Sequence, residues 1–164
     1  MDYKERQLNS SPKQELEKIK LWCAYQERSH YEVRLKLQKA GLKENEIAQI
    51  LSELISDNYL NEERFAKAFA GGKFRMKHWG RVKIKTELKK HRVSAPNIQK
   101  ALESLDEKDY QTTLRELTLK RIKTSGSRPT LRVKASVYRY LLSKGFEPEA
   151  VMEQINRNFN EHES

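Results

Sequence analysis

Residues 33–51 read VRLKLQKAGLKENEIAQIL, and this stretch decides the fold because its pattern occurs three times. Residues 84–102 (IKTELKKHRVSAPNIQKAL) and 137–155 (VYRYLLSKGFEPEAVMEQI) align with it over 19 positions without a gap. Apolar residues coincide at five positions: Val33/Ile84/Val137, Leu37/Leu88/Leu141, Leu42/Val93/Phe146, Ile47/Ile98/Val151 and Leu51/Leu102/Ile155. The first two triplets are four residues apart, as are the last two, so each pair predicts one face of a helix.

The middle of each copy predicts a tight turn between two helices. Gly41 and Gly145 occur where the first helix should end, in the left-handed cap position that glycine adopts at least cost. Arg92 replaces this glycine in the middle copy, so we expect a left-handed arginine there, at a cost of about 1–2 kcal/mol. Ser94 is placed to cap the following helix, and Pro148 suits the first turn of the last one.

A further helix precedes each pair, which makes three helices per copy. Its apolar positions are Leu16, Ile19 and Cys23 in the first copy, Phe65, Ala68 and Phe69 in the second, and Tyr110, Leu114 and Leu117 in the third. Asn61, followed by two glutamates, predicts a helix start, because its side chain caps free amides and acids favour the positive end of the helix dipole. We therefore predict an all-α fold of three tandem three-helix repeats that form an elongated, curved helical array.

The predicted organisation is a disordered N-terminal tail followed by three helical repeats. The tail covers residues 1–13, and the repeats cover 14–60, 61–106 and 107–160. The hydrophobic fraction of 37% suits a thin helical array better than one thick core. The stretch 124–130 (TSGSRPT) is expected to be an exposed loop.

Composition indicates a protein of the cytoplasm. The single cysteine, Cys23, allows no intramolecular disulfide, which fits a reducing compartment. The first residues lack the apolar core of a secretory signal, and no stretch reaches the ~20 apolar residues of a membrane span. We therefore expect a soluble, cytoplasmic monomer with no membrane partner.

Positive charge is concentrated in two blocks of the chain. Residues 64–92 contain eleven Lys and Arg against Glu87, and this window alone sums to +10, the formal net charge of the whole chain. Residues 115–144 add nine basic residues against Glu116. Charge sorted in this way costs stability through self-repulsion, and it is typical of a protein with an anionic partner, nucleic acid first among them.

The predicted contact surface combines these charges with aromatic rings. Trp79 lies in the run 73–81, where basic residues alternate with aromatic ones, and it is either a core residue or a platform for base stacking. Tyr138 and Tyr140 either stack on bases or anchor a protein contact, or else they lie between the second and third repeats. The predicted contact residues for the filament or DNA are Lys73, Arg75, Lys77, Trp79, Arg81, Lys83, Lys85, Lys89, Lys90, Arg121, Lys123, Arg128, Arg132, Lys134 and Arg139.

The sequence offers no catalytic, metal or cofactor site. Gly71-Gly72-Lys73 superficially resembles a phosphate-binding loop, but the spacing differs and Phe74 replaces the hydroxyl residue, so a helix end is the better interpretation. The four histidines are scattered, without a second ligand at metal spacing. Cys23 lies on the apolar side of a predicted helix, so we expect a buried thiol. We therefore predict a binding protein and not an enzyme.

Three short motifs give the chain a resemblance to a known family. Residues 28–37 resemble the pattern RxxSxxELxxKL, residues 59–66 (YLNEERFA) resemble GYLDDxRFA, and residues 79–88 (WGRVKIKTEL) resemble GxxRIxxEL. In this order and spacing, over residues 16–160, the chain is similar to the RecX family, the regulatory proteins of the bacterial recombinase RecA.

The sequence departs from the family pattern at two turns. Asn58 replaces the family's usual glycine before Tyr59, and His91-Arg92 replaces a Lys-Gly or similar pair. Both changes concern backbone conformation more than surface chemistry.

The resemblance implies an all-α fold of three tandem three-helix repeats and a non-enzymatic regulator without a cofactor. It also implies as partners the RecA filament and single- and double-stranded DNA, and a role in DNA repair, recombination and the SOS response. In that role the regulator restrains strand exchange and the coupled ATP hydrolysis. A stand-alone DNA- or RNA-binding helical-repeat module is the alternative, because its charge pattern would look alike.

Overall fold

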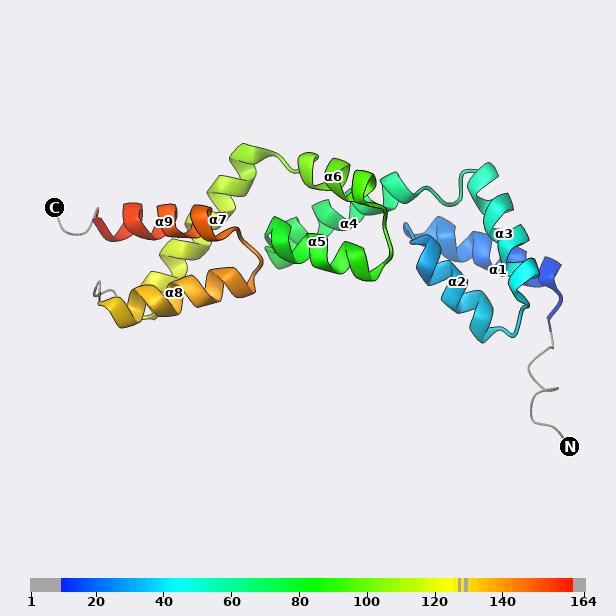
Figure 1. The fold of residues 1–164 in the computed structure, drawn as a ribbon, viewed down its shortest axis with the longest axis horizontal. Coiled ribbons are helices and arrows are strands. Elements are labelled where there is room, and N and C mark those ends of the chain that lie inside the picture. Colours follow the sequence, from blue (N-terminus) through cyan, green and yellow to red (C-terminus); the bar gives the residue numbers. More distant parts are fainter. Residues whose placement is uncertain (1–9, 127, 129, 161–164) are drawn as a thin grey trace, which may run out of the picture. The chain divides into compact units, whose positions relative to one another are not determined.

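The computed structural model describes residues 10–126, 128 and 130–160, and helices joined by short connections make up this part of the chain. These residues contain no strand and form nine α-helices (Figure 1): α1 (Pro12–Tyr25), α2 (His30–Lys39), α3 (Glu44–Ser56), α4 (Glu62–Lys77), α5 (Arg81–Lys90), α6 (Ala95–Glu103), α7 (Glu107–Thr124), α8 (Leu131–Ser143) and α9 (Pro148–Asn160). The predicted all-α fold with three helices per repeat is confirmed.

The chain forms two compact units, and each consists of discontinuous stretches. The first unit contains Met1–Ala68 and Leu88–Ile98, and the second contains Phe69–Glu87 and Gln99–Ser164. The second predicted repeat, 61–106, therefore contributes residues to both units. The repeat limits describe a sequence pattern, and we keep them as a proposal for how the helices are grouped.

Helix α1 begins inside the predicted disordered tail, 1–13. The Oγ atom of Ser11 accepts a hydrogen bond from the N–H of Gln14 at 3.2 Å, and the Gln14 side chain accepts one from the N–H of Ser11 at 3.0 Å. This reciprocal capping, with Pro12 at the first helical position, explains why the helix starts here. The prediction is therefore wrong for residues 12 and 13, whereas residues 1–9 lie outside the described part of the chain.

Two further predictions concern the helix start at Asn61 and the loop before α8. The Oδ1 atom of Asn61 accepts a hydrogen bond from the N–H of Arg64 at 2.9 Å, which confirms Asn61 as a cap. In the predicted loop 124–130, Thr124 is the last residue of α7, and residues 127 and 129 lie outside the described residues. Gly126, Arg128 and Thr130 are exposed, as expected.

The turn between the second and third helices of each repeat contains the predicted left-handed residue. The backbone φ angle is 86° at Gly41, 57° at Arg92 and 94° at Gly145. The apolar residue that follows is buried in each case: Leu42, Val93 and Phe146. Asn58 and His78 are also left-handed, with φ of 63° and 55°, and Asn58 occupies the position where the family pattern has glycine.

In the first unit, α1 and α2 both pack on α3 (Figure 1). Ile19, Val33 and Ile47 come from these three helices, and each is at most 1% exposed. Cys23 is buried in the same cluster, as predicted. The thiol therefore belongs to the core.

The turn between α5 and α6 belongs to the first unit and meets the start of α2. The Nδ1 atom of His91 lies 3.3 Å from the Oγ of Ser29 and 3.2 Å from a carboxylate oxygen of Glu32. The guanidinium carbon of Arg92 lies 4.5 Å from the centroid of the Tyr31 ring. His91 and Arg92, which depart from the family pattern, thus both contact residues at the start of α2 in the preceding repeat.

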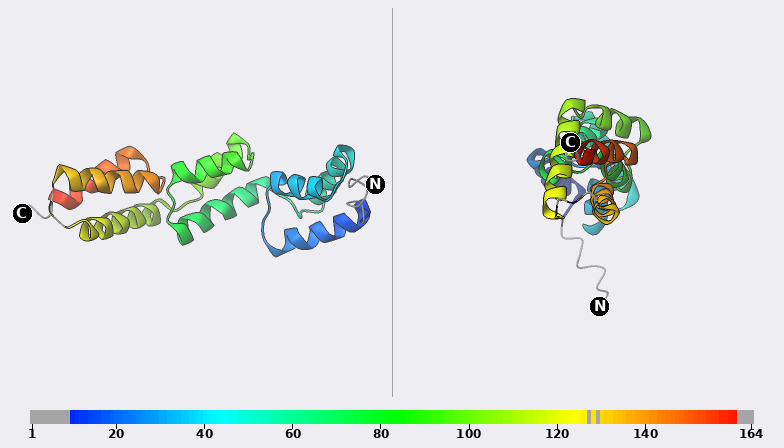
Figure 2. Two further views of the ribbon diagram at one scale, coloured as in Figure 1. Left: turned by 90° about the horizontal axis from the view of Figure 1, so that it is seen from below. Right: turned by 90° about the vertical axis from the view of Figure 1, so that its left-hand side faces the viewer.

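In the second unit, α7, α8 and α9 pack against one another (Figure 2). Tyr110 of α7 is fully buried between two rings, with centroid distances of 5.7 Å to Phe74 and 5.3 Å to Phe146. These three aromatic side chains connect α4, α7 and the turn before α9, and they form the support for the surface described below.

The apolar face of α4 differs from the prediction at one residue. Ala68 is exposed, although the prediction places it on the buried face together with Phe65. Ala66, Ala70 and Phe74 are buried instead, at intervals of four residues. Ala66 and Ala70 thus lie on the buried face of α4. Ala68, two residues from each, lies on the opposite face of the helix.

Candidate nucleic-acid interface

The connection between α4 and α5 lies against the turn between α8 and α9, within the second unit. The N–H of Gly80 donates to the carbonyl oxygen of Lys144 at 2.8 Å, and the N–H of Val82 donates to that of Gly145 at 2.9 Å. Gly80 is buried, and a Cβ atom on it would lie 2.4 Å from the carbonyl carbon of Gly145. Only glycine permits this approach of two backbones, and we name the contact the Gly80–Gly145 junction.

Trp79 lies at this junction and carries two basic side chains. The Nζ atoms of Lys83 and Lys73 are 4.7 Å and 5.0 Å from the centroid of the Trp79 ring, within the range of cation–π attraction. The ring also meets Phe69 edge-on, with centroids 6.4 Å apart, and the residue is half-buried. Trp79 therefore packs against Phe69 and carries two lysines on its ring, and its role as a platform for base stacking stays a prediction.

Lys144 joins these lysines from the other side of the junction, and the sequence analysis missed it. Its Nζ donates to the backbone carbonyl oxygen of Lys77 at 2.7 Å. Burial, together with the charges of Lys83 and Lys77, lowers the pKa of Lys144. The sequence feature that could have identified Lys144 is its position in the second basic block, directly before the turn glycine Gly145.

Arg81 is a predicted contact residue whose charge is compensated inside the protein. Its guanidinium group forms ion pairs with Glu107 and Glu147, the second at 3.1 Å, and it lies 3.7 Å from the centroid of the Tyr110 ring. The Tyr110 hydroxyl accepts a hydrogen bond from the N–H of Arg81 at 3.0 Å and donates one to Glu147. Burial and the bond to Glu147 raise the pKa of Tyr110. Arg81 therefore cross-links α5, α7 and the start of α9 through these contacts.

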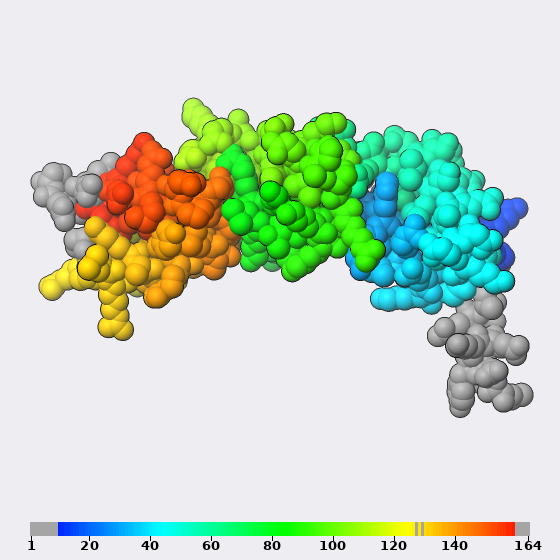
Figure 3. Space-filling model, in the orientation of Figure 1, coloured from blue at the N-terminus to red at the C-terminus, as the bar shows by residue number. Residues whose placement is uncertain are grey.

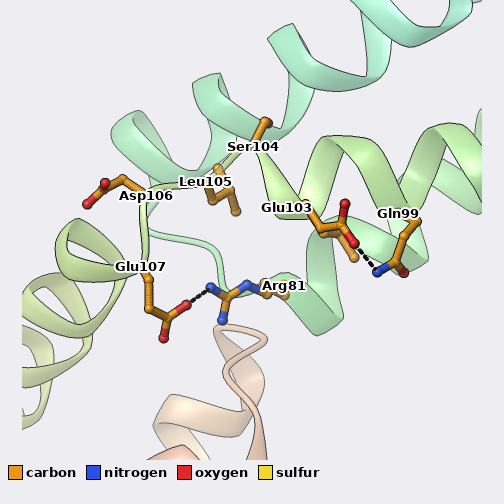
Figure 4. A pocket seen from close by; sticks show the side chains of 8 residues that line it. Arg81, Gln99, Glu103, Ser104, Leu105, Asp106 and Glu107 are labelled. Carbon is orange, nitrogen blue, oxygen red and sulfur yellow. Dashed lines mark hydrogen bonds and ion pairs between the residues drawn. The ribbon is translucent and has the colours of Figure 1, made fainter.

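An open groove lies beside this cross-link. Figure 4 shows Arg81 and Glu107 facing each other at its edge, with Glu103 bonded to Gln99 farther along α6. The groove lining combines leucines with acidic side chains, and its arginine is already paired. It therefore lacks the positive character expected of a surface that contacts phosphates.

Most other predicted residues of the first block are exposed. Arg75, Lys77 and Lys85 belong to the second unit, whereas Lys89 and Lys90 belong to the first. The second unit therefore holds the greater part of the predicted surface, and three of its lysines, Lys73, Lys83 and Lys144, lie at the Gly80–Gly145 junction.

The second basic block is distributed over α7, α8 and their connection. The guanidinium carbon of Arg121 lies 4.5 Å from the Tyr140 ring centroid, and the Nζ of Lys134 lies 5.4 Å from that of Phe159. Side chains near the start of α8 project from the surface of this unit (Figure 3). The exposed members of the predicted set here are Lys123, Arg128, Arg132 and Arg139.

Tyr138 and Tyr140 are half-buried. Tyr140 is in contact with Arg121, which belongs to the same predicted repeat, so this contact does not lie between repeats. Its ring supports an arginine in the way that Trp79 supports two lysines.

Two features of the sequence that could have indicated a chemical site, the Gly71-Gly72-Lys73 segment and Cys23, both belong to helices in the structure. Gly71, Gly72 and Lys73 lie within α4 and not at its end, so the predicted helix end is misplaced and no loop is available there to hold a phosphate. Burial raises the pKa of Cys23 to about 11, which keeps the thiol protonated and unreactive. Within residues 10–126, 128 and 130–160, no cluster of His, Cys, Asp or Glu side chains could hold a metal ion. None of the described helices combines the length and apolar character needed to span a bilayer.

Comparison with known proteins gives matches by sequence over most of the chain. A family model described as "RecX, second three-helix domain" matches residues 61–102. The chain is 33% identical over 128 residues to "Regulatory protein RecX" of Pasteurella multocida (strain Pm70), a match that covers 77% of this chain and 76% of that protein. It is 25% identical over 138 residues to the protein of the same name from Haemophilus influenzae (strain PittGG), covering 84% and 90% of the two chains.

The fold is also similar to that of solved structures. The crystal structure of RecX from Lactobacillus salivarius matches with a TM-score of 0.81, covering 91% of this chain and 96% of that chain. The two sequences are 20% identical, so this likeness establishes the helical fold alone.

Proposed function

Because the chain belongs to the RecX family, we propose that it binds the RecA–DNA filament and restrains strand exchange and the coupled ATP hydrolysis. The relatives reported above are named regulatory proteins, which supports a regulatory role without chemistry of its own. We expect the protein to act in the cytoplasm as a monomer, without a cofactor.

The basic surface around the Gly80–Gly145 junction is the observation that carries the DNA part of the proposal. Lys73, Lys77 and Lys83 come from α4 and α5, and Lys144 reaches them from the turn before α9. Lysines that neutralise phosphates release bound counterions, and this release drives association at low salt. Arg81 is not part of this surface, because two carboxylates already pair with it.

The proposal is tested by measuring DNA-dependent ATP hydrolysis by RecA with and without this protein. We expect the hydrolysis rate to fall as the protein is added, until the filament is saturated. An unchanged rate at concentrations where binding to the filament is demonstrated would contradict the proposal.

A binding measurement distinguishes this role from that of a stand-alone nucleic-acid module. If the filament is the partner, affinity for RecA–DNA should clearly exceed affinity for bare DNA at the same salt concentration. Comparable affinities would favour the stand-alone module, because phosphate contacts alone would then explain binding. The variant Lys83→Ala/Lys85→Ala should flatten the log–log salt dependence by about 1.4–1.8 if each lysine neutralises one phosphate.

A further inference from the structure

Four lysines lie at the Gly80–Gly145 junction, and we name them the lysine cluster: Lys73, Lys77, Lys83 and Lys144. The ammonium groups of Lys73 and Lys83 lie over the Trp79 ring, 5.0 Å and 4.7 Å from its centroid. The ammonium group of Lys144 donates to the Lys77 carbonyl oxygen at 2.7 Å, and the charge of Lys77 acts on it. Across the part of the chain that the structure describes, no carboxylate forms an ion pair with any of the four.

The like charges of the lysine cluster repel one another, and a bound anion would reduce this repulsion. Burial and the charges of Lys83 and Lys77 lower the pKa of Lys144, so the folded protein disfavours its charged form. Glu107 and Glu147 belong to the same unit, but both are already in ion pairs. An anion with two charges would offset the repulsion between the ammonium groups, and it would supply the acceptors that lysine Nζ donors require.

We propose that the lysine cluster binds a phosphate group and that the bound phosphate stabilises the Gly80–Gly145 junction. This rests on the proposed function, since a DNA-bound filament presents phosphodiester groups to the surface of the protein. A free polyphosphate chain, such as that of a nucleotide, offers the same chemistry. The proposal thus specifies a phosphate group as the ligand. The experiment below distinguishes a phosphate of DNA from a phosphate of a nucleotide.

Phosphate binding is coupled to closure of the Gly80–Gly145 junction because the lysines belong to elements on its two sides. Lys73 and Lys83 belong to α4 and α5, whereas Lys144 belongs to the turn between α8 and α9. The cluster is complete only while the Gly80–Gly145 junction is closed. A ligand that binds only the closed form shifts the equilibrium toward that form, in proportion to its saturation.

Amide hydrogen exchange at Gly80 and Val82 measures this coupling directly, because these two N–H groups make the backbone hydrogen bonds of the junction. The experiment uses the full-length protein, with an oligothymidylate and tripolyphosphate as separate probes. At a probe concentration about 100 times its Kd, both amides should exchange up to about 100-fold more slowly. The amide of Val33, in the core of the first unit, serves as the reference and should not respond.

Two double variants with the same change in net charge provide the comparison. Lys83→Met/Lys144→Met removes half of the lysine cluster, and Lys120→Met/Lys123→Met removes two exposed lysines of α7. We expect the cluster variant to lose the slowing caused by the probes and the α7 variant to keep it. Equal slowing in the two variants, or none in the unmodified protein with either probe, would overturn the proposal. Lys83→Met alone retains the bond from Lys144 to the Lys77 carbonyl, and it should still weaken the slowing.

The probes separate the two sources of phosphate. Slowing by the oligothymidylate alone assigns the site to a nucleic-acid backbone, and slowing by tripolyphosphate alone assigns it to a nucleotide. Slowing by both supports a general phosphate site. If the cluster variant still restrains RecA ATP hydrolysis and no probe slows exchange, the proposed function survives and only this inference fails.

Discussion

Replacing Gly80 with alanine should destabilise the protein by about 2–3 kcal/mol, through the two backbone hydrogen bonds of the Gly80–Gly145 junction. A Cβ atom at this position would lie 2.4 Å from both the carbonyl carbon and the carbonyl oxygen of Gly145 and 2.5 Å from the nitrogen of Phe146. All three are backbone atoms, so no side-chain rotation relieves the overlap. The segments must separate by roughly 1 Å, which takes the hydrogen bonds of Gly80 and Val82 beyond the usual donor–acceptor range.

Urea unfolding followed by circular dichroism measures this effect, and Gly72→Ala is the matched control. Gly72 lies within α4, and a Cβ on it would meet nothing within 4 Å. Alanine is favoured over glycine inside a helix by about 0.5–1 kcal/mol, so this variant should be more stable than the unmodified protein. The two substitutions should therefore have opposite signs. If Gly80→Ala were as stable as Gly72→Ala, the close backbone contact at the junction would be refuted.

Three further substitutions or truncations test other parts of the structure. Arg92→Gly should raise the Tm by relieving part of the ~1–2 kcal/mol of left-handed strain, and a lower Tm would mean that the arginine contact with Tyr31 outweighs that strain. Burial lowers the pKa of His30 from its usual 6.5, so the unfolded chain binds a proton that the folded chain resists, and stability should fall as the pH drops below that value. His30→Gln should reduce the fall between about pH 7 and 5 in urea unfolding, and an identical fall would exclude His30 as its source. The fragment 1–106 contains the stretches of the first unit and should keep their helical circular dichroism, but it should lose most filament affinity. Equal affinity of a folded 1–106 and the full-length protein would leave a single local docking site.

The helices and their buried faces could be predicted because they depend on residues close together in the chain. Val33, Ile84 and Val137 head the three copies of the repeat, and all three are 0% exposed. The left-handed conformation of Arg92 was also predictable, because its alignment with two glycines specifies the backbone and not the side chain. The prediction for Ala68 was wrong because α4 has alanines at 66, 68 and 70, and the sequence pattern alone did not specify that Ala66 and Ala70 form the buried face.

The candidate site could be predicted only in part, because its geometry depends on contacts between distant residues. Arg81 reads as one more surface charge in the first basic block, yet its partners Glu107 and Glu147 lie 26 and 66 residues farther along the chain. Lys144 was overlooked for the same reason, since its partner Lys77 lies 67 residues away. Periodicity predicts which residues are at the surface, but it does not specify which of the surface charges neutralise each other.

The discontinuity of the two compact units has a consequence for chimeric genes. Exchanging residues 61–106 for those of a relative would replace parts of both cores at once, because that repeat is shared between the units. A graft that preserves the first core has to carry Met1–Ala68 together with Leu88–Ile98, a combination that no single crossover can deliver. In this chain the unit that repeats in the sequence and the unit that packs compactly therefore have different boundaries. Gene shuffling among relatives should therefore tolerate crossovers poorly within α4 and α5, even where the aligned sequences are similar.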